Sequence, residues 1–274
     1  MKIKNCFLVF FVITCLFCIG CLSSINNIRS INTSDLISQK EFTFMTFNIQ
    51  AGCGYSTYGI SPQYCKVKNK DLIFLVEAIK SVDPDIVALQ EVRGFYQAKL
   101  LATQLNLNFV YSTHGNFWGL AILSKHPIEN FKTHTINPSY NPRIALTCEI
   151  LIGNKLISFV NVHYHLGNYK NQVKSTIHTL KKENNPIVLL GDLNRDPSDK
   201  VLEPIYNRLI DTCKVVKTQD AQNVIKHGTC HGYLIDYIFL DSSTFDVKNA
   251  SLIPSKYKWA SDHKAYYTTV TLKK

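Results

Sequence analysis

The sequence predicts a single α/β domain in which helices cover sheets of buried strands. Several strand-like segments are almost continuously apolar, as expected for strands that are buried on both faces. Segments with apolar residues at helical spacing alternate with these strands. No repeat, low-complexity tract or Pro/Ser-rich linker divides residues 41–274, so we expect them to form one domain.

The composition agrees with a folded domain of this size. Of the 274 residues, 46% are hydrophobic and only 18% are charged, which excludes an intrinsically disordered chain. The length excludes a peptide hormone or a bare binding motif. The formal charge of +10 favours anionic partners such as nucleic acid or a membrane surface.

Two strands and two helices are expected in the first part of the domain. β-Branched and aromatic residues predict a strand over residues 42–49, and a Gly-rich loop follows it. Apolar side chains at helical spacing predict a helix over residues 71–82, which ends at an Asp-Pro pair. A short buried strand over residues 86–90 and a helix over residues 96–105 come next.

Strands dominate the rest of the domain, with two further helices. The same apolar patterns predict strands over residues 119–123, 143–152, 156–163, 187–190, 234–240 and 265–272. Helices are expected over residues 169–182 and 198–209.

Residues 1–21 are typical of a secretory signal peptide. Lys2 and Lys4 precede an apolar run over residues 6–19 that a single threonine interrupts, and small residues follow. The run is shorter than the ~20 residues of a membrane-spanning helix, and a retained anchor is the alternative. Removal of the two lysines lowers the formal charge from +10 to +8. We therefore expect a secreted or extracytoplasmic protein.

Two further features follow from the residues around this segment. Residues 18–21 resemble a bacterial lipoprotein cleavage box, so a lipid anchor on Cys21 is another alternative, although Cys18 stands where that box usually has leucine. Residues 22–40 are polar and irregular, and we expect them to form a flexible leader before the domain.

The sequence predicts two disulfide bonds in the exported protein. Five cysteines follow the leader: Cys53, Cys65, Cys148, Cys213 and Cys230. We expect Cys53–Cys65 and Cys213–Cys230 bonds, because these four lie in loop-like, Gly-containing surroundings and exported proteins meet an oxidising environment. Free thiols are the alternative. Cys148 lies in an expected strand, so we predict that it is free and buried.

Polar side chains that can carry chemistry occur where the expected strands begin or end. They are Asn48, Glu91, His163, Asp192, Asn194, Asp236, Asp262 and His263. Loops at strand ends commonly carry catalytic groups on a rigid scaffold. Taken singly, each residue has an ordinary alternative as a turn, cap or core residue.

As a set, these residues suit the metal-assisted hydrolysis of a phosphodiester. Mg²⁺ prefers oxygen ligands, and Asn48, Glu91 and Asp262 can supply them. Hydrolysis also needs a deprotonated water, neutralised phosphoryl oxygens and a stabilised leaving oxygen. Histidine, aspartate and a metal ion can divide these tasks.

Seven short motifs resemble, in order, those of the endonuclease/exonuclease/phosphatase superfamily. They are Met45-Thr-Phe-Asn-Ile-Gln, Ala88-Leu-Gln-Glu-Val, Gly119-Leu-Ala-Ile-Leu-Ser-Lys, Asn161-Val-His, Gly191-Asp-Leu-Asn, Ile235-Asp-Tyr-Ile and Ser261-Asp-His. The resemblance covers residues 42–272. It implies a four-layer α/β/β/α sandwich, in which two mixed sheets lie face to face with helices outside.

The resemblance also implies a metal site. Glu91 looks like the principal Mg²⁺ ligand, and Asn48 and Asp262 look like residues that complete or support the site. Mn²⁺ and Ca²⁺ are the alternative cations.

The catalytic groups of the family have counterparts in this sequence. His263 resembles the histidine that activates the attacking water, and Asp236 resembles its orienting carboxylate. In some branches the aspartate that matches Asp192 is the base instead. His163 resembles the second histidine, which contacts the phosphate and protonates the leaving oxygen.

Three residues match phosphate-contacting positions. Asn194 resembles a residue that binds a phosphate oxygen, and Arg143 lies where relatives place a phosphate-contacting arginine. Arg195 follows Asn194 and is a further candidate, with pairing to a nearby aspartate as the alternative.

The function implied most directly is that of a secreted, Mg²⁺-dependent endonuclease that is similar to deoxyribonuclease I and hydrolyses DNA phosphodiester bonds. Residues 191–197 are similar to a segment of the nuclease subunit of cytolethal distending toxin, so a toxin is one alternative. A sphingomyelinase-type phosphodiesterase would act on membrane lipid and would need exposed aromatic loops, for which residues 117–118 and 256–259 are candidates. A noncatalytic binding protein on the same scaffold is the third. The positive charge favours nucleic acid, and the sequence identifies no protein partner.

Overall fold

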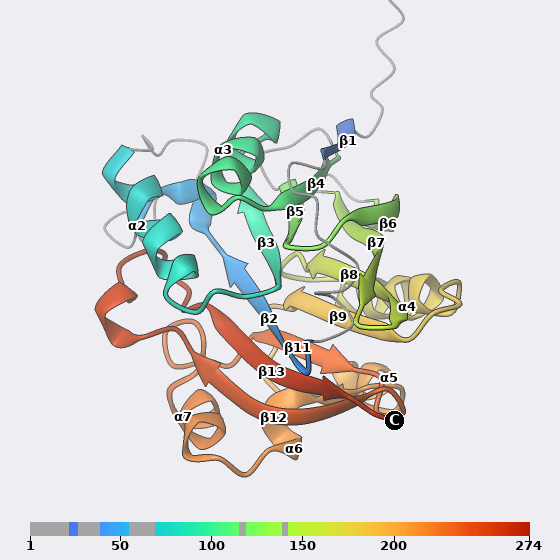
Figure 1. Cartoon of the computed structure of the whole chain (residues 1–274). Coiled ribbons are helices and arrows are strands. Elements are labelled where there is room, and N and C mark those ends of the chain that lie inside the picture. Colours follow the sequence, from blue (N-terminus) through green and yellow to red (C-terminus); the bar gives the residue numbers. More distant parts are fainter. Residues whose placement is uncertain (1–21, 27–38, 55–68, 115–118, 139–141) are drawn as a thin grey trace, which may run out of the picture.

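The computed structural model describes residues 22–26, 39–54, 69–114, 119–138 and 142–274. In these residues a seven-stranded sheet and a six-stranded sheet pack face to face between helices (Figure 1). The predicted four-layer α/β/β/α sandwich is therefore confirmed. Strands buried on both faces explain why so many segments of the sequence are continuously apolar.

The seven-stranded sheet contains the first polar motifs of the sequence. Its strands are, in spatial order, β1 (Leu22–Asn26), β4 (Asn108–Thr113), β5 (Gly119–Ser124), β3 (Ile86–Val92), β2 (Glu41–Asn48), β13 (Tyr266–Leu272) and β12 (Phe245–Leu252). Within this described sheet only β2 and β3 run parallel, with Asn48 opposite Gln90. Because β13 runs antiparallel to β2, it begins at the end of the sheet where β2 and β3 finish.

The six-stranded sheet repeats this arrangement. Its strands are, in spatial order, β10 (Ile210–Asp211), β11 (Asp236–Leu240), β9 (Ile187–Asp192), β8 (Lys155–His163), β7 (Arg143–Ile152) and β6 (Ile128–Asn137). Only β8 and β9 are parallel among these strands, with His163 opposite Asp192. The antiparallel strand β11 begins at the same end, with Asp236 opposite Asp192. Each sheet therefore brings polar residues to one end of the sandwich.

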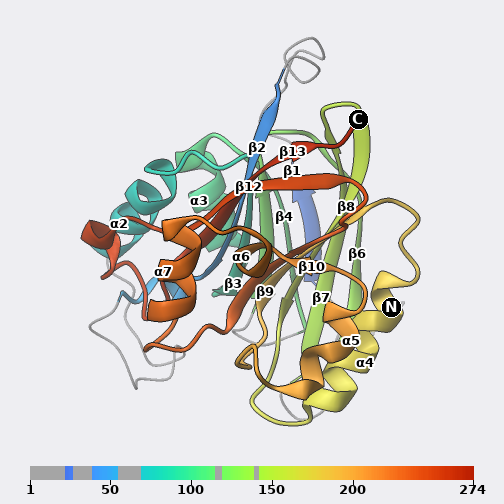
Figure 2. The ribbon, with the colours of Figure 1, turned by 90° about the horizontal axis from the view of Figure 1, so that it is seen from below.

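Helices form the two outer layers. Figure 2 shows α2 (Asn69–Lys80) and α3 (Phe95–Leu105) on one side of the strands, and α4 (Tyr169–Leu180) and α5 (Glu203–Tyr206) on the other. Two further helices, α6 (Thr212–Val215) and α7 (Gln219–His227), pack against β12. Short 3₁₀ turns are η1 (Gln50–Gly52), η4 (Lys200–Leu202) and η5 (Ser255–Tyr257). None of the helices in the described residues is both long enough and apolar enough to cross a membrane.

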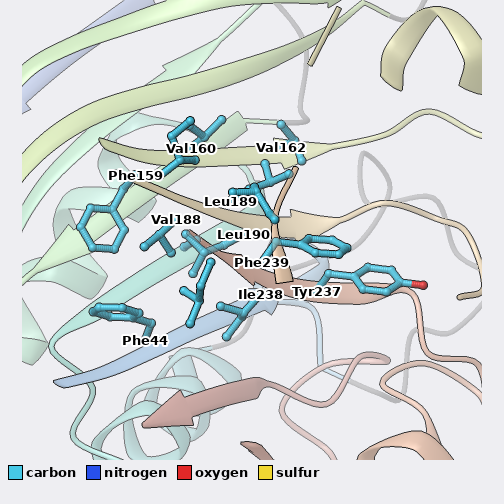
Figure 3. Packing of buried hydrophobic residues seen from close by; sticks show 14 of the residues in the cluster. Phe44, Phe159, Val160, Val162, Val188, Leu189, Leu190, Tyr237, Ile238 and Phe239 are labelled. Carbon is cyan, nitrogen blue, oxygen red and sulfur yellow. The ribbon is translucent and has the colours of Figure 1, made fainter. Parts of the chain in front are cut away.

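The alternation of β2 separates two apolar cores. Phe42 and Phe44 point into the core between the sheets, whereas Met45 and Phe47 pack with α2 and α3. In the core between the sheets, the ring of Phe44 meets the ring of Phe159 edge-on at 5.2 Å (Figure 3). Burial of each such side chain stabilises the fold by about 1.5–3 kcal/mol.

A buried amide pair joins the two sheets below the polar end. Gln90 on β3 donates from Nε2 to Asn161 Oδ1 on β8 at 2.8 Å. Asn161 donates from Nδ2 to the carbonyl oxygens of Leu89 and Ala121, both at 2.9 Å. Both amide side chains are fully buried, so these hydrogen bonds satisfy polar groups that would otherwise be costly inside the core.

The elements that the sequence patterns missed lie mainly at the sheet edges. Unpredicted elements in the described residues are β1, β4, β6, β10, β12, α6 and α7. Four of them, β1, β12, β10 and β6, are the edge strands of the two sheets. An edge strand with an exposed face carries polar residues and lacks the continuous apolar run used for prediction, as the burial pattern of β6 illustrates.

Two predicted boundaries need correction. Residues Leu22–Asn26 belong to the predicted flexible leader over 22–40, but they form β1, which pairs with β4. Backbone pairing at a sheet edge does not require an apolar pattern. The helix predicted over residues 198–209 is instead the short η4 turn followed by α5, with Pro204 in the first turn of α5.

The cysteines follow the prediction only in part. Cys148 is free and buried, as predicted, but Cys213 and Cys230 are also free, so the predicted Cys213–Cys230 bond is wrong. Each thiol has another contact: Cys213 donates to Asp211 Oδ1 at 3.1 Å, and Cys230 hydrogen-bonds with His263. The loop-like, Gly-containing surroundings on which the prediction rested do not show which cysteines lie close enough to bond.

The other predicted bond is described only at one end. Cys53 is disulfide-bonded, and its predicted partner Cys65 lies outside the described residues. The same holds for the predicted signal peptide over residues 1–21, which includes Cys21.

Candidate active site

Six of the polar residues predicted from the sequence meet at one end of the sandwich. Asn48 and Glu91 come from the ends of β2 and β3, and His163 and Asp192 from the ends of β8 and β9. Asp236 begins β11, and His263 precedes β13. The sheets supply three residues each because each has one parallel pair and an antiparallel neighbour that begins at the same end.

Asn48 joins the carboxylates of the two sheets. It donates from Nδ2 to Glu91 Oε1 and to Asp192 Oδ2, both at 3.1 Å. Its Oδ1 accepts the backbone N–H of Gln50 at 3.1 Å. Asn48 therefore holds Glu91 and Asp192 in place through its nitrogen, while its oxygen is used by the backbone.

A chain of three side chains connects Asp236 to Asp192. His263 donates from Nδ1 to Asp236 Oδ2 at 2.8 Å, and its Nε2 lies 3.8 Å from Asp192 Oδ2. A histidine that is held through one ring nitrogen presents the other in a fixed direction. Cys230, which the sequence analysis did not place here, hydrogen-bonds with the same histidine.

His163 lies on the other side of Asp192. Its Nε2 is 3.5 Å from Asp192 Oδ2 and 3.9 Å from Glu91 Oε1. Arg143 at the start of β7 is buried, and its positive charge acts on Glu91, Asp192 and His163. The site thus contains two histidines and an arginine around the buried carboxylate of Asp192 and the partly exposed carboxylate of Glu91.

Local backbone geometry permits this crowding. Gly191, directly before Asp192, has φ 144°, and a Cβ there would lie 2.0 Å from the carbonyl oxygen of Val162. Only glycine lets β9 approach β8 this closely beneath His163 and Asp192. Glu91 and Asn194 adopt φ 54° and 51°, the left-handed region that is uncommon for residues other than glycine.

The surroundings of the two carboxylates, Glu91 and Asp192, raise their pKa values. Burial raises the pKa of Glu91 to about 7, and the nearby charges of Asp262 and Asp192 act in the same direction. Burial and the charge of Asp236 raise the pKa of Asp192 to about 7. Both carboxylates are therefore close to the point at which they exchange protons at neutral pH.

The two histidines shift in opposite directions. Burial and the positive charge of Arg143 hold the pKa of His163 well below its usual value. Burial also opposes the charge of His263, but the carboxylate of Asp236 and its hydrogen bond raise the pKa of His263 well above the usual value. At neutral pH His163 is neutral and His263 is protonated.

Comparison with known proteins identifies the family. The model of the endonuclease/exonuclease/phosphatase family matches residues 45–263, which is most of the chain. The chain belongs to the endonuclease/exonuclease/phosphatase family. Members of this family are metal-dependent hydrolases, and we conclude that the chain is a hydrolytic enzyme. No curated protein sequence matches it.

Solved structures share the family fold at low sequence identity. The human Nocturnin catalytic domain with a bound sulfate anion is 19% identical, with a TM-score of 0.66 over 85% of this chain and 95% of that chain. Truncated TDP2 from Caenorhabditis elegans is 20% identical, with a TM-score of 0.64 over 84% and 97%. An endonuclease/exonuclease/phosphatase from Beutenbergia cavernae is 19% identical, with a TM-score of 0.64 over 85% and 72%.

A divalent cation, as expected in an endonuclease/exonuclease/phosphatase enzyme, fits the carboxylates around Glu91. Glu91 and Asp262 offer hard oxygen donors, and Asp262 is close enough for its charge to raise the pKa of Glu91. Asp192, Asp236 and His263 also place ligand atoms within 4.8 Å of one another. In that group the hydrogen bond between Asp236 Oδ2 and His263 Nδ1 leaves Asp236 Oδ1 and His263 Nε2 for a ligand. The described residues therefore offer two places that a cation could occupy, one at Glu91 and Asp262 and one at Asp192, Asp236 and His263.

Asn194 and Arg195, which were predicted to contact the phosphate, have other partners in the structure. Asn194 follows β9, and its Nδ2 donates to the carbonyl oxygen of Tyr164 at 2.9 Å. Arg195 turns away: its guanidinium pairs with Asp199 at 3.4 Å and lies 3.4 Å from the centroid of the Tyr169 ring. The ordinary alternative for Arg195, pairing with a nearby aspartate, is thus realised.

Cys230 and the amide pair of Gln90 and Asn161 were not predicted from the sequence as parts of this end of the sandwich. Both amides lie inside the quoted motifs, but the motifs drew attention to their neighbours Glu91 and His163. Two glutamine or asparagine residues inside otherwise apolar strands are a signal that could have indicated a buried polar pair. Nothing in the sequence distinguishes Cys230 from other loop cysteines.

Proposed function

We propose that this enzyme is a Mg²⁺-dependent nuclease that hydrolyses phosphodiester bonds in DNA. The observation that carries this proposal is the line of side chains from Asp236 through His263 to Asp192, at 2.8 and 3.8 Å, beside the Glu91 carboxylate, whose side chain is 13% exposed. This arrangement places a general base, a positively charged histidine and a metal-binding carboxylate in one site. Phosphodiester hydrolysis requires groups of these kinds.

Asp192 is the group best suited to take the proton of the attacking water. Its pKa is raised to about 7, and a base with a pKa near the working pH combines availability with sufficient basicity. His263 is protonated at neutral pH because Asp236 stabilises its positive charge. We therefore assign the base to Asp192, the second of the two possibilities that the sequence left open.

The remaining groups bind and neutralise the phosphate. Protonated His263 presents Nε2 beside Asp192 and can donate to a phosphoryl oxygen as negative charge develops there. Neutral His163 and buried Arg143 lie on the opposite side of Asp192 and provide further donors. A cation held by Glu91 and Asp262 would neutralise charge on the phosphoryl group and stabilise the leaving oxygen.

Positive charge beside the site supports a polyanionic substrate. Lys170 and Lys174 on α4 and Lys181 directly after it are exposed, line a groove between α4 and the η4–α5 segment, and form no ion pair within the described part of the chain. The helix begins six residues after His163 and leads back to the start of β9, so Lys170 is the lysine nearest the site and Lys181 the most distant. Nucleic-acid phosphates are bound by such lysines, with affinity that falls as salt rises. The sulfate bound to the Nocturnin domain supports anion binding by this fold.

Export is part of the same proposal. The lysines and apolar run of residues 1–21 support secretion or another extracytoplasmic location, with a lipid anchor on Cys21 as the alternative.

A substrate panel tests the proposal. Purified protein that lacks residues 1–21 is incubated with Mg²⁺ and with plasmid DNA, RNA or sphingomyelin vesicles, at low and physiological salt. We expect DNA cleavage to exceed lipid hydrolysis and to weaken steeply with salt. Excess EDTA should abolish turnover.

Specific outcomes contradict each part of the proposal. Full turnover in EDTA would exclude the metal requirement, and lipid turnover above DNA cleavage would favour the phospholipid alternative. His263→Ala protein, prepared in the same way, reveals cleavage by a contaminating nuclease.

A further inference from the structure

Three side chains in the described residues stand out by their exposure. Tyr96, Leu166 and Tyr233 are 84%, 71% and 64% exposed, more than any other large apolar side chain in that part of the chain. Each lies three to five residues from a group in the proposed site: Glu91, His163 and Asp236, respectively. Trp259, which is 51% exposed, lies three residues before Asp262. Exposed apolar groups concentrated around one site indicate that this site binds something.

These four residues, which we call the rim, lie close in sequence to the strand ends that carry the site. Tyr96 is in the first turn of α3, and the other three are in loops. Tyr96 and Trp259 follow β3 and precede β13 in one sheet, and Leu166 and Tyr233 follow β8 and precede β11 in the other. The rim therefore has members from both sheets, as the site itself does.

The segments that carry the rim are held in place by hydrogen bonds. The fully buried Gln172 accepts from the backbone N–H of His165 at 2.7 Å and donates to the carbonyl oxygen of Gly167 at 2.7 Å, which fixes Leu166 between them. The side chain of Gln97 accepts from the N–H of Arg93 at 2.7 Å and donates to Ala51 O at 2.6 Å. Gln97 thus secures the start of α3 directly beside Tyr96.

The other two members are equally anchored. Cys230 and Tyr233 exchange backbone hydrogen bonds of 3.0 and 2.7 Å across a two-residue turn, and Cys230 is paired with His263 on its other side. Both central residues of the turn, His231 and Gly232, have positive φ, as a type I′ turn requires. Trp259 precedes Ser261, whose hydroxyl donates to the carbonyl oxygen of Asn48 at 2.8 Å.

Positive charge accompanies the aromatic rings of this region. Lys258 Nζ lies 4.6 Å from the centroid of the Trp259 ring, and Lys256 Nζ lies 4.8 Å from that of Tyr257. Aromatic platforms interleaved with lysine are typical of surfaces that bind single-stranded nucleic acid, in which bases stack on the rings and phosphates meet the cations. A lipid-binding surface would instead need a continuous apolar area, whereas the rim residues stand on one helix and three separate loops.

We propose that the rim stacks unpaired nucleobases on both sides of the scissile phosphate, so that the enzyme prefers single-stranded to double-stranded nucleic acid. This inference rests on the proposed nuclease function and specifies its substrate class. In a duplex the bases stack on one another and their faces are hidden, so tyrosine rings beside the site cannot reach them without unpairing. A single strand offers those faces at no such cost.

Cleavage of one sequence in two forms tests the proposal. The value of kcat/KM is measured on a single-stranded oligonucleotide and on the duplex of the same sequence. We expect Tyr96→Ala and Tyr233→Ala each to lower kcat/KM on the single strand about tenfold, the scale of one lost base–aromatic stack. The factor by which kcat/KM falls on the duplex should be at least fivefold smaller. Tyr96→Phe and Tyr233→Phe should restore the preference, because stacking needs the ring and not the hydroxyl.

Matched controls come from exposed apolar residues elsewhere. Ile73 on α2 and Ile225 on α7 are 58% and 53% exposed. Their replacement by alanine should leave both rates unchanged. Equal losses on single strand and duplex in the tyrosine variants, or no loss on either, would overturn the proposal.

A binding measurement separates this inference from the proposed function. A single strand that contains 2-aminopurine is titrated with protein in EDTA, where stacking quenches the fluorescence without cleavage. If the wild-type protein quenches the fluorescence and the tyrosine variants do not, the proposal for the rim is supported. If the wild-type enzyme nevertheless cleaves no nucleic acid, only the proposed function fails. The proposal for the rim is overturned if the wild-type protein does not quench the fluorescence. It is also overturned if the tyrosine variants lose binding to sphingomyelin vesicles but still cleave the single strand normally.

Discussion

His163 and His263 both approach the same oxygen of Asp192, yet their pKa values are shifted in opposite directions. Their Nε2 atoms are 3.5 and 3.8 Å from Asp192 Oδ2, and the side chains are 4% and 8% exposed. Burial disfavours the charged form of both. The pKa of His163 nevertheless lies well below the usual value, whereas that of His263 lies well above it.

The charged neighbour of each ring explains why the two pKa values differ. His163 faces the positive charge of Arg143, and His263 is hydrogen-bonded to the carboxylate of Asp236. A strong charge-assisted hydrogen bond can outweigh desolvation, while a like charge adds to it. One site therefore holds two histidines whose pKa values are shifted in opposite directions beside the same carboxylate.

Removal of either ring should have the largest effect. We expect His263→Ala and His163→Ala each to lower the rate at least ~10²-fold, the scale of a lost proton-transfer or charge-stabilising group, while the fold is retained. Initial rates on the best substrate of the panel and thermal unfolding curves measure the two quantities. His227→Ala, at the exposed end of α7, is the matched histidine control. A near-normal rate in either site variant would contradict the role of that histidine.

Neutralising Asp236 should remove the difference between the rings. In Asp236→Asn protein, burial remains but the carboxylate that raises the pKa of His263 is gone, so this pKa should fall. NMR titration of the His263 ring protons in EDTA measures the shift. The rate should fall less than in His263→Ala, about tenfold, because the imidazole is still present. An unchanged His263 titration would show that Asp236 is not the cause.

Glu91→Gln tests the charge balance through stability. The pKa of Glu91 is raised from 4.5 to about 7, so the unfolded chain loses its proton first, and metal-free protein loses stability as pH rises from about 4.5 to 7. The variant lacks this loss. At pH 8 in EDTA its Tm should exceed that of the wild type by roughly 7–14 °C, and at pH 4 the two should agree.

Added Mg²⁺ provides the complementary measurement for the same variant. It should raise the Tm of the wild type at pH 8 and have a much smaller effect on Glu91→Gln. A lower Tm for the variant in EDTA at pH 8 would contradict the burial cost assigned to Glu91.

Arg143→Gln should produce the smallest change of the series. Loss of the guanidinium removes one cause of the low pKa of His163, but burial, the main cause, remains. The pKa should therefore rise and still lie below the usual 6.5. NMR titration of His163 detects this, and a pKa that fell or stayed constant would exclude an electrostatic link between the two residues.

The central strands and the polar residues that end them were accessible from the sequence, but edges and side-chain directions were not. Runs such as residues 187–190 are apolar because both faces are covered, so pattern and structure agree there. The edge strands β6 and β12 have exposed faces and lack that pattern. Whether Asn48 turns an oxygen or a nitrogen toward Glu91 depends on the N–H of Gln50, a tertiary detail that no motif encodes.

The same limit applies to pairings between distant segments. Cys213 and Cys230 both lie near β11, but one is buried in α6 and the other points to His263. Arg195 follows a phosphate-contacting motif, yet the ring of Tyr169 and the carboxylate of Asp199 draw it aside. Sequence spacing identified the candidates, and packing decided their partners.

The amide pair between the sheets constrains the order in which this chain can fold. Gln90 and Asn161 are 71 residues apart, so a long loop must close before they meet, which places their pairing late in folding. A docking of the two sheets that is shifted by one residue would bury both amides without partners. Glu91 adjoins one amide and His163 follows the other by two residues. Asn48 on β2 and Asp192 on β9 likewise meet across the two sheets, so the site is complete only when the sheets are docked in the register that pairs the two amides.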